Sequence, residues 1–313
     1  MHEIGQPWLP VRAALHPAGL YLALRQIDPQ QLRDAFMQET VVRLSAPETF
    51  VHIAREDIGK ASPDTAPVGL IFHVARCGST LLSQSLKLLD NVVVYAEPLP
   101  INEILSPPHP WPRHELVAAL RSLGAALASH ARRPYVIKFS SWNTLFCDIV
   151  SEAFPGSPWI LSLRDPVEVG ISLLKQPPGW FRDSGETSRQ LAALVDPDGA
   201  SKSPEEHVAR LYGAFCSAAA RLDATRGKLI AYDDLPAAVW DAVAPHFSLS
   251  IDSRQRRLIE ESSRNYAKAP VGNPRAFSPD AAAKQAAASA ALHQAIDEFA
   301  RPPLQRLKRL HTP

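Results

Sequence analysis

Cysteine, net charge and long apolar runs are all scarce in this sequence. Its cysteines are the widely spaced Cys77, Cys147 and Cys216, in a chain of 313 residues. An odd number at such spacing suits neither a disulfide framework nor a zinc site, so we expect free thiols. Lys and Arg total 33 against 32 for Asp and Glu. No overall charge favours nucleic acid or an anionic membrane as a partner, so any anion site must be local.

Apolar stretches are too short to span a bilayer, and the first residues lack a charged segment followed by an apolar run. We therefore expect a cytoplasmic protein without a membrane span. A chain of this length allows one large domain or two small ones, at about 150 residues per domain. We expect one α/β domain over residues 67–313, with an N-terminal extension, residues 1–66, packed on its core. In the extension, Asp28, Pro29 and Gln31 form a capping signature and predict a helix from Pro29 to about Val42.

From Val68 onward, short apolar runs alternate with amphipathic segments of helical length, which is typical of a parallel β-sheet flanked by helices on both faces. The expected strands are Val68–Ala75, Asn91–Ala96, Tyr135–Phe139, Trp159–Leu163 and Lys228–Tyr232. The expected helices are Thr80–Leu89, Glu115–Ala131, Thr144–Ala153, Val167–Lys175, Pro204–Arg226, Ala237–His246 and Ala281–Arg301. Residues 176–203, rich in Pro, Gly, Ser and Asp, interrupt this pattern and indicate a lid, a binding loop or a disordered insert.

The segment Ile71–Leu82 predicts a strand, a tight turn and the start of a helix. A helix N-terminus offers unpaired N–H groups and a partial positive charge, and the preceding turn adds further donors. Gly78 allows close approach of the backbone, and Arg76 adds a full charge with bidentate geometry. These features predict a phosphate cradle, which consists of Arg76, Cys77, Gly78, Ser79, Thr80 and Leu81.

The cradle is neither a Walker A loop nor a cysteine phosphatase loop. A Walker A loop needs a Lys before the hydroxyl residue and a second Gly five residues upstream, where His73 stands. A phosphatase loop would close with an Arg where this chain has Ser83. An ordinary capped turn between a strand and a helix remains an alternative, so a second site is needed to decide.

That second site is expected after the fourth strand of the sheet. Arg164 would lie at the carboxyl edge of this strand, where ligands of open α/β sheets bind. Ser172 falls about two turns into the following helix. The segment Leu163–Ser172 is therefore able to bind a second phosphate.

Together the two sites resemble the nucleotide-binding motifs of the sulfotransferase family. The family's 5′-phosphosulfate loop has the form K/R-x-G-S/T-S/T, matched by Arg76–Thr80. Its 3′-phosphate motif is R-N/D-P followed by a Ser, matched by Arg164 and Ser172. The segment Leu229–Leu235 resembles the family's Y-E-D-L strand end, whose Tyr, here Tyr232, helps to hold the adenine side. The resemblance covers roughly residues 68–250 and implies a fold like that of P-loop nucleoside triphosphatases.

The resemblance also implies a reaction. A sulfuryl group would pass from 3′-phosphoadenylyl sulfate (PAPS) to a hydroxyl or amine of an acceptor, with 3′-phosphoadenosine 5′-phosphate (PAP) leaving and no essential metal. Arg76 takes the position of the family's loop Lys or Arg and would stabilise charge on the bridging oxygen. Lys138 matches a family Lys that approaches the transferring group, although a Lys at a strand end equally often extends to solvent.

The general base of this reaction is harder to assign. Cytosolic relatives place a His two residues after the family Lys, but this chain has Ser140 there, which is no base at neutral pH. Glu97 resembles the Glu of a Glu-Pro pair in carbohydrate sulfotransferases, and we assign it as the base, with a pKa raised by partial burial. An ordinary ion pair is the alternative role for Glu97. His73, His109 and His114 are substitutes, although His73 lies in an apolar strand and is expected in the core.

Four further residues are candidates for ligand contacts. The loop Tyr266–Arg275 occupies the region where relatives place a basic segment over the 3′-phosphate, so Lys268 and Arg275 are candidate contacts. Trp180 and Phe181, in the insert, either line an acceptor pocket or hold the insert against the core.

Two other functions compete with sulfuryl transfer. A P-loop-like kinase would use ATP and Mg²⁺ and would need an acidic metal ligand near Thr80. A binding module for a nucleotide bisphosphate, without turnover, is the second, because Ser140 replaces the family's His. The acceptor class stays open among small molecules, carbohydrates, lipids and peptides.

Overall fold

The computed structural model describes residues 7–60, 65–182, 185–269, 272–273, 275–276, 278 and 280–311. Positions 270, 271 and 274 of the predicted loop Tyr266–Arg275 lie outside these residues, as do 183 and 184 of the insert. The described part of the extension is 7–60 and 65–66. None of the described helices is long and apolar enough to cross a membrane.

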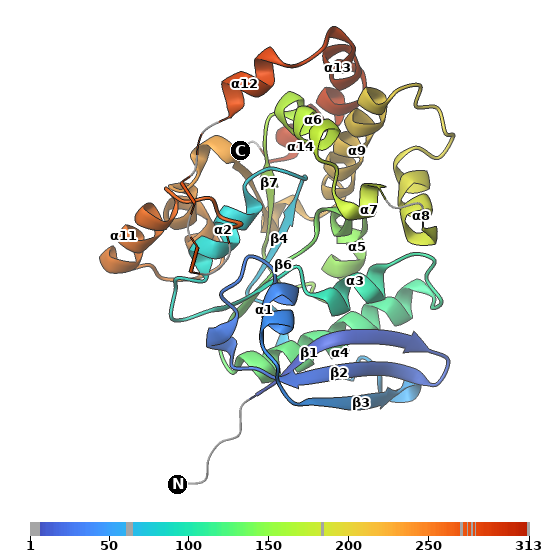
Figure 1. Cartoon of the computed structure of the whole chain (residues 1–313). Helices are drawn as coiled ribbons and strands as arrows, with labels where there is room; N and C mark the ends of the chain where they lie inside the picture. Colours follow the sequence, from blue (N-terminus) through green and yellow to red (C-terminus); the bar gives the residue numbers. More distant parts are fainter. Residues whose placement is uncertain are drawn as a thin grey trace.

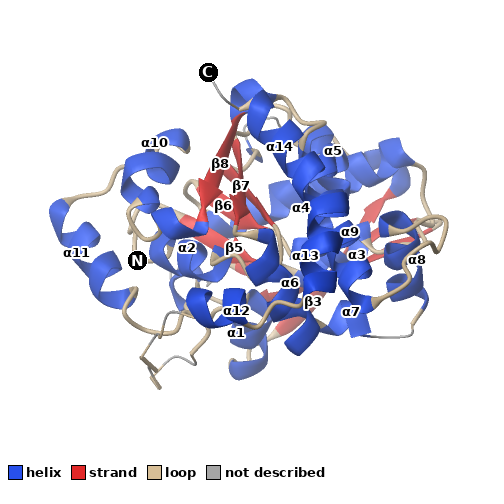
Figure 2. Ribbon diagram, turned by 90° about the horizontal axis from the view of Figure 1, so that it is seen from above, coloured by secondary structure: helices blue, strands red, loops and turns tan. Residues whose placement is uncertain are grey.

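A five-stranded parallel sheet occupies the centre of the molecule, in the order β5-β6-β4-β7-β8 (Figure 2). Its strands are β4 (Gly69–His73), β5 (Val93–Ala96), β6 (Tyr135–Lys138), β7 (Trp159–Leu163) and β8 (Gly227–Ala231). All five predicted strands are present, with ends that differ from the prediction by at most two residues. Because the strands pair in parallel, their carboxyl ends lie along one edge of the sheet.

Helices cover both faces of this sheet, which confirms the expected α/β class (Figures 1 and 2). Leu70 and Phe72 of β4 enter one core and Ile71 enters the other, because successive strand residues point to opposite faces. The helices on the Ile71 side are α2 (Ser79–Leu86), α10 (Ala244–His246) and α11 (Ser253–Ser262). The larger core lies under α3 (Leu99–Leu105), α4 (Arg113–Ala131), α5 (Cys147–Ala153), α6 (Pro166–Lys175), α9 (Pro204–Ala219), α13 (Ala290–Ala295) and α14 (Arg301–Leu310).

Most predicted helices are divided or shortened. Thr80–Leu89 ends at Leu86, Thr144–Ala153 begins as a 3₁₀ segment before α5, and Ala237–His246 is a π-helix, Val239–Val243, followed by α10. Three others differ more. The predicted helix Pro29–Val42 is a 3₁₀ turn, Pro29–Gln31, followed by α1 (Met37–Arg43). The capping box is present, but it caps only the turn, and the intervening Asp34 bonds to side chains of α1 instead of continuing a helix. The predicted helix Ala281–Arg301 is α12 (Ala281–Ala286), then α13, which Ser289 caps. The predicted helix Pro204–Arg226 ends at Ala219 as α9.

The N-terminal extension contains a three-stranded antiparallel sheet that our sequence analysis missed. Its strands, in the order β1-β2-β3, are β1 (Trp8–His16), β2 (Gly19–Gln26) and β3 (Glu48–Ala54). Leu9 and Val11 of β1, with Leu20 and Leu22 of β2, join the larger core. The sheet lies against α3 and α4 at the end of the molecule that is lowest in Figure 1.

The insert, residues 176–203, is partly helical rather than irregular. It contains α7 (Gly179–Arg182) and α8 (Glu186–Val195), and Leu191 of α8 is buried. Phe181 contacts the ring of His207 on α9, with 5.0 Å between centroids. These contacts favour the role of holding the insert against the core for Phe181.

Candidate functional site

The residues singled out in the sequence come together at the carboxyl edge of the central sheet. Glu97 follows β5, and Lys138 ends β6. Arg76 follows β4, Arg164 follows β7, and Tyr232 follows β8. The strand order therefore arranges these side chains from Glu97 at one side to Tyr232 at the other. This edge is where open α/β sheets bind ligands.

The N-terminus of α2 is open to an anion. Its N-cap residue is Gly78, which has a φ of 81° and no side chain, so no side chain caps the helix. Ser79 and Thr80 begin the helix and are both buried. At α6, by contrast, the Asp165 carboxylate accepts hydrogen bonds from the first N–H groups. Free first-turn N–H groups attract anions, so α2 rather than α6 suits a phosphate or a sulfuryl group.

Tyr232 connects the two predicted anion sites. A Cβ atom added at Gly78 would lie 2.6 Å from Cδ2 of Tyr232, so the ring lies directly on the α2 loop. The other contact of this ring is with Arg164, whose Cζ lies 4.1 Å from the ring centroid. One aromatic ring therefore separates the α2 loop from the guanidinium of the second site.

Arg76 and Glu97 both have left-handed backbone conformations, with φ values of 60° and 53°. Such values are uncommon for residues other than glycine and are often found at functional sites. The Arg76 guanidinium donates to Oε1 of Gln176, the residue that ends α6, over 2.5 Å. The side chain is thus directed along the loop toward the insert.

Glu97 forms an ion pair with Lys138. Nζ of Lys138 donates to Oε1 of Glu97, and the Ser140 hydroxyl donates to Oε2 over 3.1 Å. Lys138 is 1% exposed, whereas a quarter of the Glu97 side chain remains exposed. The ion-pair alternative for Glu97 is therefore observed. Ser140, which stands where the family has a His, donates a hydrogen bond to the Glu97 carboxylate.

The pKa of Glu97 is lowered, not raised as we had expected for a base. Burial alone would raise this pKa, but the charge of Lys138 and the hydrogen bonds from Lys138 and Ser140 outweigh burial. Glu97 is therefore ionised at neutral pH. Each carboxylate oxygen accepts more than one hydrogen bond, so Glu97 retains capacity for a further donor.

His73 is a core residue, as its apolar strand predicted. It is 5% exposed, and its ring nitrogens lie 2.8 Å from the Val74 carbonyl oxygen and 2.9 Å from that of Phe139. Burial lowers the pKa of His73 to about 4. Because both nitrogens face backbone carbonyl groups, His73 holds β4 to the loop after β6 and is poorly placed to act as a base.

Lys268 lies with the Glu97–Lys138 pair rather than near the 3′-phosphate motif. Its Nζ is 5.6 Å from the ring centroid of Phe36, and Nζ of Lys138 is 5.3 Å from the same centroid. Burial lowers the pKa of Lys268, and the charges of Arg76 and Lys138 lower it further. Lys268 therefore lies near Arg76 and the Glu97–Lys138 pair. Arg275 is exposed, and its carbonyl group accepts from the Tyr266 N–H over 2.6 Å.

Arg164 is held by two carboxylates. Its side chain is 7% exposed, and its nitrogens bond to Glu168 over 2.6 Å and to Asp280 over 2.8 Å. Ser172, the second residue of this motif, donates to the Glu168 carbonyl oxygen over 2.7 Å. Asp280 precedes α12, so the C-terminal region supplies a carboxylate to the predicted 3′-phosphate site.

Cys77 and Leu81 are the remaining residues of the predicted cradle. Cys77 is 1% exposed, and its carbonyl oxygen accepts from the Ser162 hydroxyl over 3.2 Å. Burial raises the pKa of the Cys77 thiol, which makes it a poor nucleophile. Leu81 lies in the first turn of α2. In the described part of the chain, no group of three or more His, Cys, Asp or Glu side chains is arranged to hold a metal ion.

No protein-family model matches the chain, and a search of curated proteins finds no match. Solved structures do match. A sulfotransferase domain of the Synechococcus PCC 7002 olefin synthase is 16% identical, with a TM-score of 0.46, and covers 75% of this chain and 94% of its own. A sulfotransferase from Alicyclobacillus acidocaldarius is 17% identical, with a TM-score of 0.42 and coverages of 78% and 95%. Mouse sulfotransferase SULT7A1, complexed with PAP, is 11% identical, with a TM-score of 0.42 and coverages of 82% and 90%.

Each of these similar structures is a sulfotransferase. Beside the residues of the sulfotransferase-like motifs, four others reach this site and were missed in the sequence, namely Phe36, Gln176, Tyr212 and Asp280. Tyr212 donates from α9 to the Arg164 carbonyl oxygen over 2.8 Å. No local motif marks these residues, because each reaches the site from an element remote in sequence.

Proposed function

We propose that this protein is a PAPS-dependent sulfotransferase. The observation that carries the proposal is the row of groups at the sheet edge: an uncapped helix N-terminus with Arg76, joined through Tyr232 to Arg164. A nucleoside with phosphate groups at both its 5′ and 3′ positions needs two such anion sites with a flat surface near them. The sequence motifs at Arg76–Thr80 and Arg164–Ser172 support the same assignment.

The 5′-phosphosulfate would lie at the N-terminus of α2, and the 3′-phosphate at Arg164. The first-turn N–H groups, Arg76 and Lys268 would share the negative charge of the first group. Arg164 would exchange the Asp280 carboxylate for the 3′-phosphate, because a doubly charged phosphate is the stronger partner for a guanidinium. Tyr232, which matches the family's Tyr, would help to hold the adenine side.

In the proposed reaction the acceptor oxygen or nitrogen attacks the sulfur atom. A new bond to sulfur forms while the bond from sulfur to the bridging oxygen breaks, and its electron pair stays on the 5′-phosphate of PAP. Arg76 and Lys138 stabilise the charge that develops on the bridging and sulfuryl oxygens. Glu97 accepts the proton of the acceptor, with Ser140 and Lys138 holding its carboxylate in position.

The direct test is a thermal-shift titration with PAP on the wild type and on Arg164→Ala. We expect PAP to raise the Tm of the wild type. In Arg164→Ala the affinity should fall at least about tenfold, because charge-assisted hydrogen bonds contribute about 1.5–3 kcal/mol. Each shift is measured relative to the same variant without PAP, so that lost stability is not counted as lost binding.

Arg189→Ala is the matched control, because Arg189 is an exposed arginine that pairs with Glu186 in the insert. It should keep the full PAP shift. An equal PAP shift in Arg164→Ala would remove Arg164 from the site. A shift caused by ATP with Mg²⁺, but not by PAP, would favour the kinase instead.

A further inference from the structure

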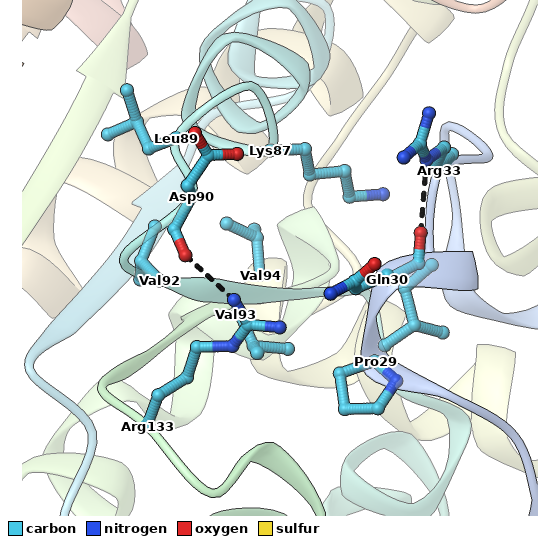
Figure 3. A pocket seen from close by; sticks show the side chains of 11 residues that line it. Pro29, Gln30, Arg33, Lys87, Leu89, Asp90, Val92, Val93, Val94 and Arg133 are labelled. Atoms are coloured by element: carbon cyan, nitrogen blue, oxygen red, sulfur yellow. Dashed lines mark hydrogen bonds between the residues drawn. The ribbon is translucent and has the colours of Figure 1, made fainter.

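A cavity of about 350 Å³ lies beside β5, the edge strand of the central sheet (Figure 3). One wall comes from the turn Pro29–Gln31 and the residues after it, and the other from the end of α2 and from β5. Its lining residues are Pro29, Gln30, Leu32, Arg33, Lys87, Leu89, Asp90, Val92, Val93, Val94 and Arg133. The volume is at the small end of the range for small-molecule sites.

Three basic side chains line this cavity, and backbone carbonyl groups rather than carboxylates hold them. Arg33 Nε donates to the Gln30 carbonyl oxygen over 3.0 Å, and Arg133 Nη1 donates to that of Asp90 over 2.7 Å. Lys87 Nζ donates to the carbonyl oxygen of Asp34. Within the described residues, none of Arg33, Lys87 and Arg133 forms an ion pair (Figure 3).

Carboxylates near the cavity leave its positive charge largely uncompensated. Asp34 accepts from Thr40 over 2.7 Å and pairs with Arg43 over 2.7 Å. Asp90 is the one acidic residue in the lining, so three cations and one carboxylate give the lining a net charge of +2. Positive charge without a counter-charge, in a concave surface, favours the entry of an anion.

Lys87 and Arg133 are partly buried, whereas Arg33 is exposed. Burial lowers the pKa of Lys87 to about 8, and the charge of Lys138 lowers it further, while Asp34 raises it. The pKa stays lowered although Asp34 raises it, so the nearby negative charge does not offset burial, and a bound anion would.

We propose that this cavity binds a small organic anion, with a carboxylate or phosphate head held by Arg33, Lys87 and Arg133. The apolar body of the ligand lies against Leu32, Leu89 and the valines of β5. This site is separate from the nucleotide site and does not depend on the proposed sulfotransferase activity. Its ligand is either the acid group of the acceptor or a separate metabolite of the same chemistry.

The test uses isothermal titration with 4-hydroxyphenylacetate, its uncharged amide and inorganic phosphate. Wild-type protein should bind the acid saturably and the amide at least about tenfold more weakly, a factor that equals about 1.4 kcal/mol. The double variant Arg33→Gln/Arg133→Gln should lose at least tenfold in affinity for the acid. Phosphate should bind the wild type at two kinds of site, of which this variant loses one.

Two controls separate this cavity from other anion sites. Arg132→Gln changes the same charge one residue away, outside the lining, and should bind the acid as the wild type does. Arg164→Gln should also bind the acid as the wild type does, and it should lose phosphate binding only at the nucleotide site. Undiminished binding of the acid in the double variant, or failure of the wild type to prefer the acid over the amide, would overturn the proposal.

A transfer assay identifies the source of the anion. If the acid is sulfated in preference to the amide, and the double variant loses this preference, the anion is part of the acceptor. If both are sulfated equally while the acid still binds, the ligand is a separate metabolite. If neither is sulfated, the two compounds are not acceptors; the PAP titration then decides the proposed function, and the titration with the acid still decides whether the cavity binds an anion.

Discussion

The Arg164 guanidinium is already paired with carboxylates. Glu168 and Asp280 satisfy its guanidinium in the structure, whereas the proposed function needs the same group for a phosphate. Glu168 lies in α6, which begins two residues after Arg164, and is 8% exposed, so it is fixed in place. Asp280 is half-exposed and also pairs with Lys284 over 2.7 Å. Asp280 is therefore the partner that a phosphate displaces.

Asp280→Asn should tighten PAP binding. The substitution keeps the shape of the side chain but removes one negative charge from the site, and a like charge near the surface costs roughly 1 kcal/mol. We expect the dissociation constant for PAP to fall roughly fivefold, measured by isothermal titration. Asp297→Asn, which alters an exposed ion pair with Arg301, is the control. Weaker binding in Asp280→Asn would mean that Asp280 helps to hold the nucleotide instead.

The lowered pKa of Glu97 predicts the pH dependence of transfer. A carboxylate whose pKa is lowered in the folded state remains a base down to that pKa, and its stabilising contribution is lost as the pH falls through it. The acid limb of kcat/KM should therefore lie below the ordinary pKa of a glutamate. Lys138→Met removes the main charge that lowers the pKa of Glu97, so the acid limb should move to higher pH.

The measurement is the pH profile of kcat/KM for the wild type, Lys138→Met and Ser140→Ala. Ser140→Ala removes only one hydrogen bond and should move the limb less. Lower activity in Lys138→Met is expected for either a structural or a catalytic role, so the position of the limb is the readout. An unmoved limb in Lys138→Met would exclude Glu97 as the group that titrates.

At the scale of elements, the turn before α2 has no room for a side chain at Gly78. Gly78 must adopt a φ of 81°, and any Cβ there would meet the Tyr232 ring. Both conditions depend on glycine, because other residues rarely adopt this conformation and the ring leaves no room. The conformation exposes the first N–H groups of α2 to a ligand.

Gly78→Ala should destabilise the fold by about 1–3 kcal/mol and abolish the PAP shift, because it displaces the loop from Tyr232. Thermal melting with and without PAP measures both effects. Gly199→Ala is a matched control, since Gly199 also has a positive φ, of 59°, but nothing lies within 4 Å of an added Cβ. A full PAP shift in Gly78→Ala would show that the loop backbone does not contact the nucleotide.

Elements were predictable where one local pattern was strong. Four of the five parallel strands, β4 to β7, are short apolar runs buried on both faces, so continuous hydrophobicity marked them. The small sheet of the extension was missed, although Leu9, Val11 and Ala13 alternate in β1 as a half-buried strand should. Pro10 and an irregular register obscured that period. The helix predicted from Pro29 failed because Asp34 bonds to α1 instead of continuing the turn.

At the scale of the whole molecule, the site is assembled from segments far apart in the chain. Gln176 meets Arg76 across 100 positions, and Asp280 meets Arg164 across 116. Phe36 brings the N-terminal extension to Lys138. The extension also forms one wall of the basic cavity, so it contributes to both sites that we propose.

The order of residues along the chain was enough to specify the parallel sheet and, at its carboxyl edge, the two loops that we propose as anion sites. These features follow from local rules, because apolar runs, a helix start and a glycine in a turn each act within a few residues. Packing alone decided which charges lie together. Glu97 pairs with Lys138 and Arg164 with Asp280, whereas the three cations of the basic cavity have no acidic partner among the residues that the structure describes. Electrostatic partners depend on distances between elements, and these exist only after the cores have formed.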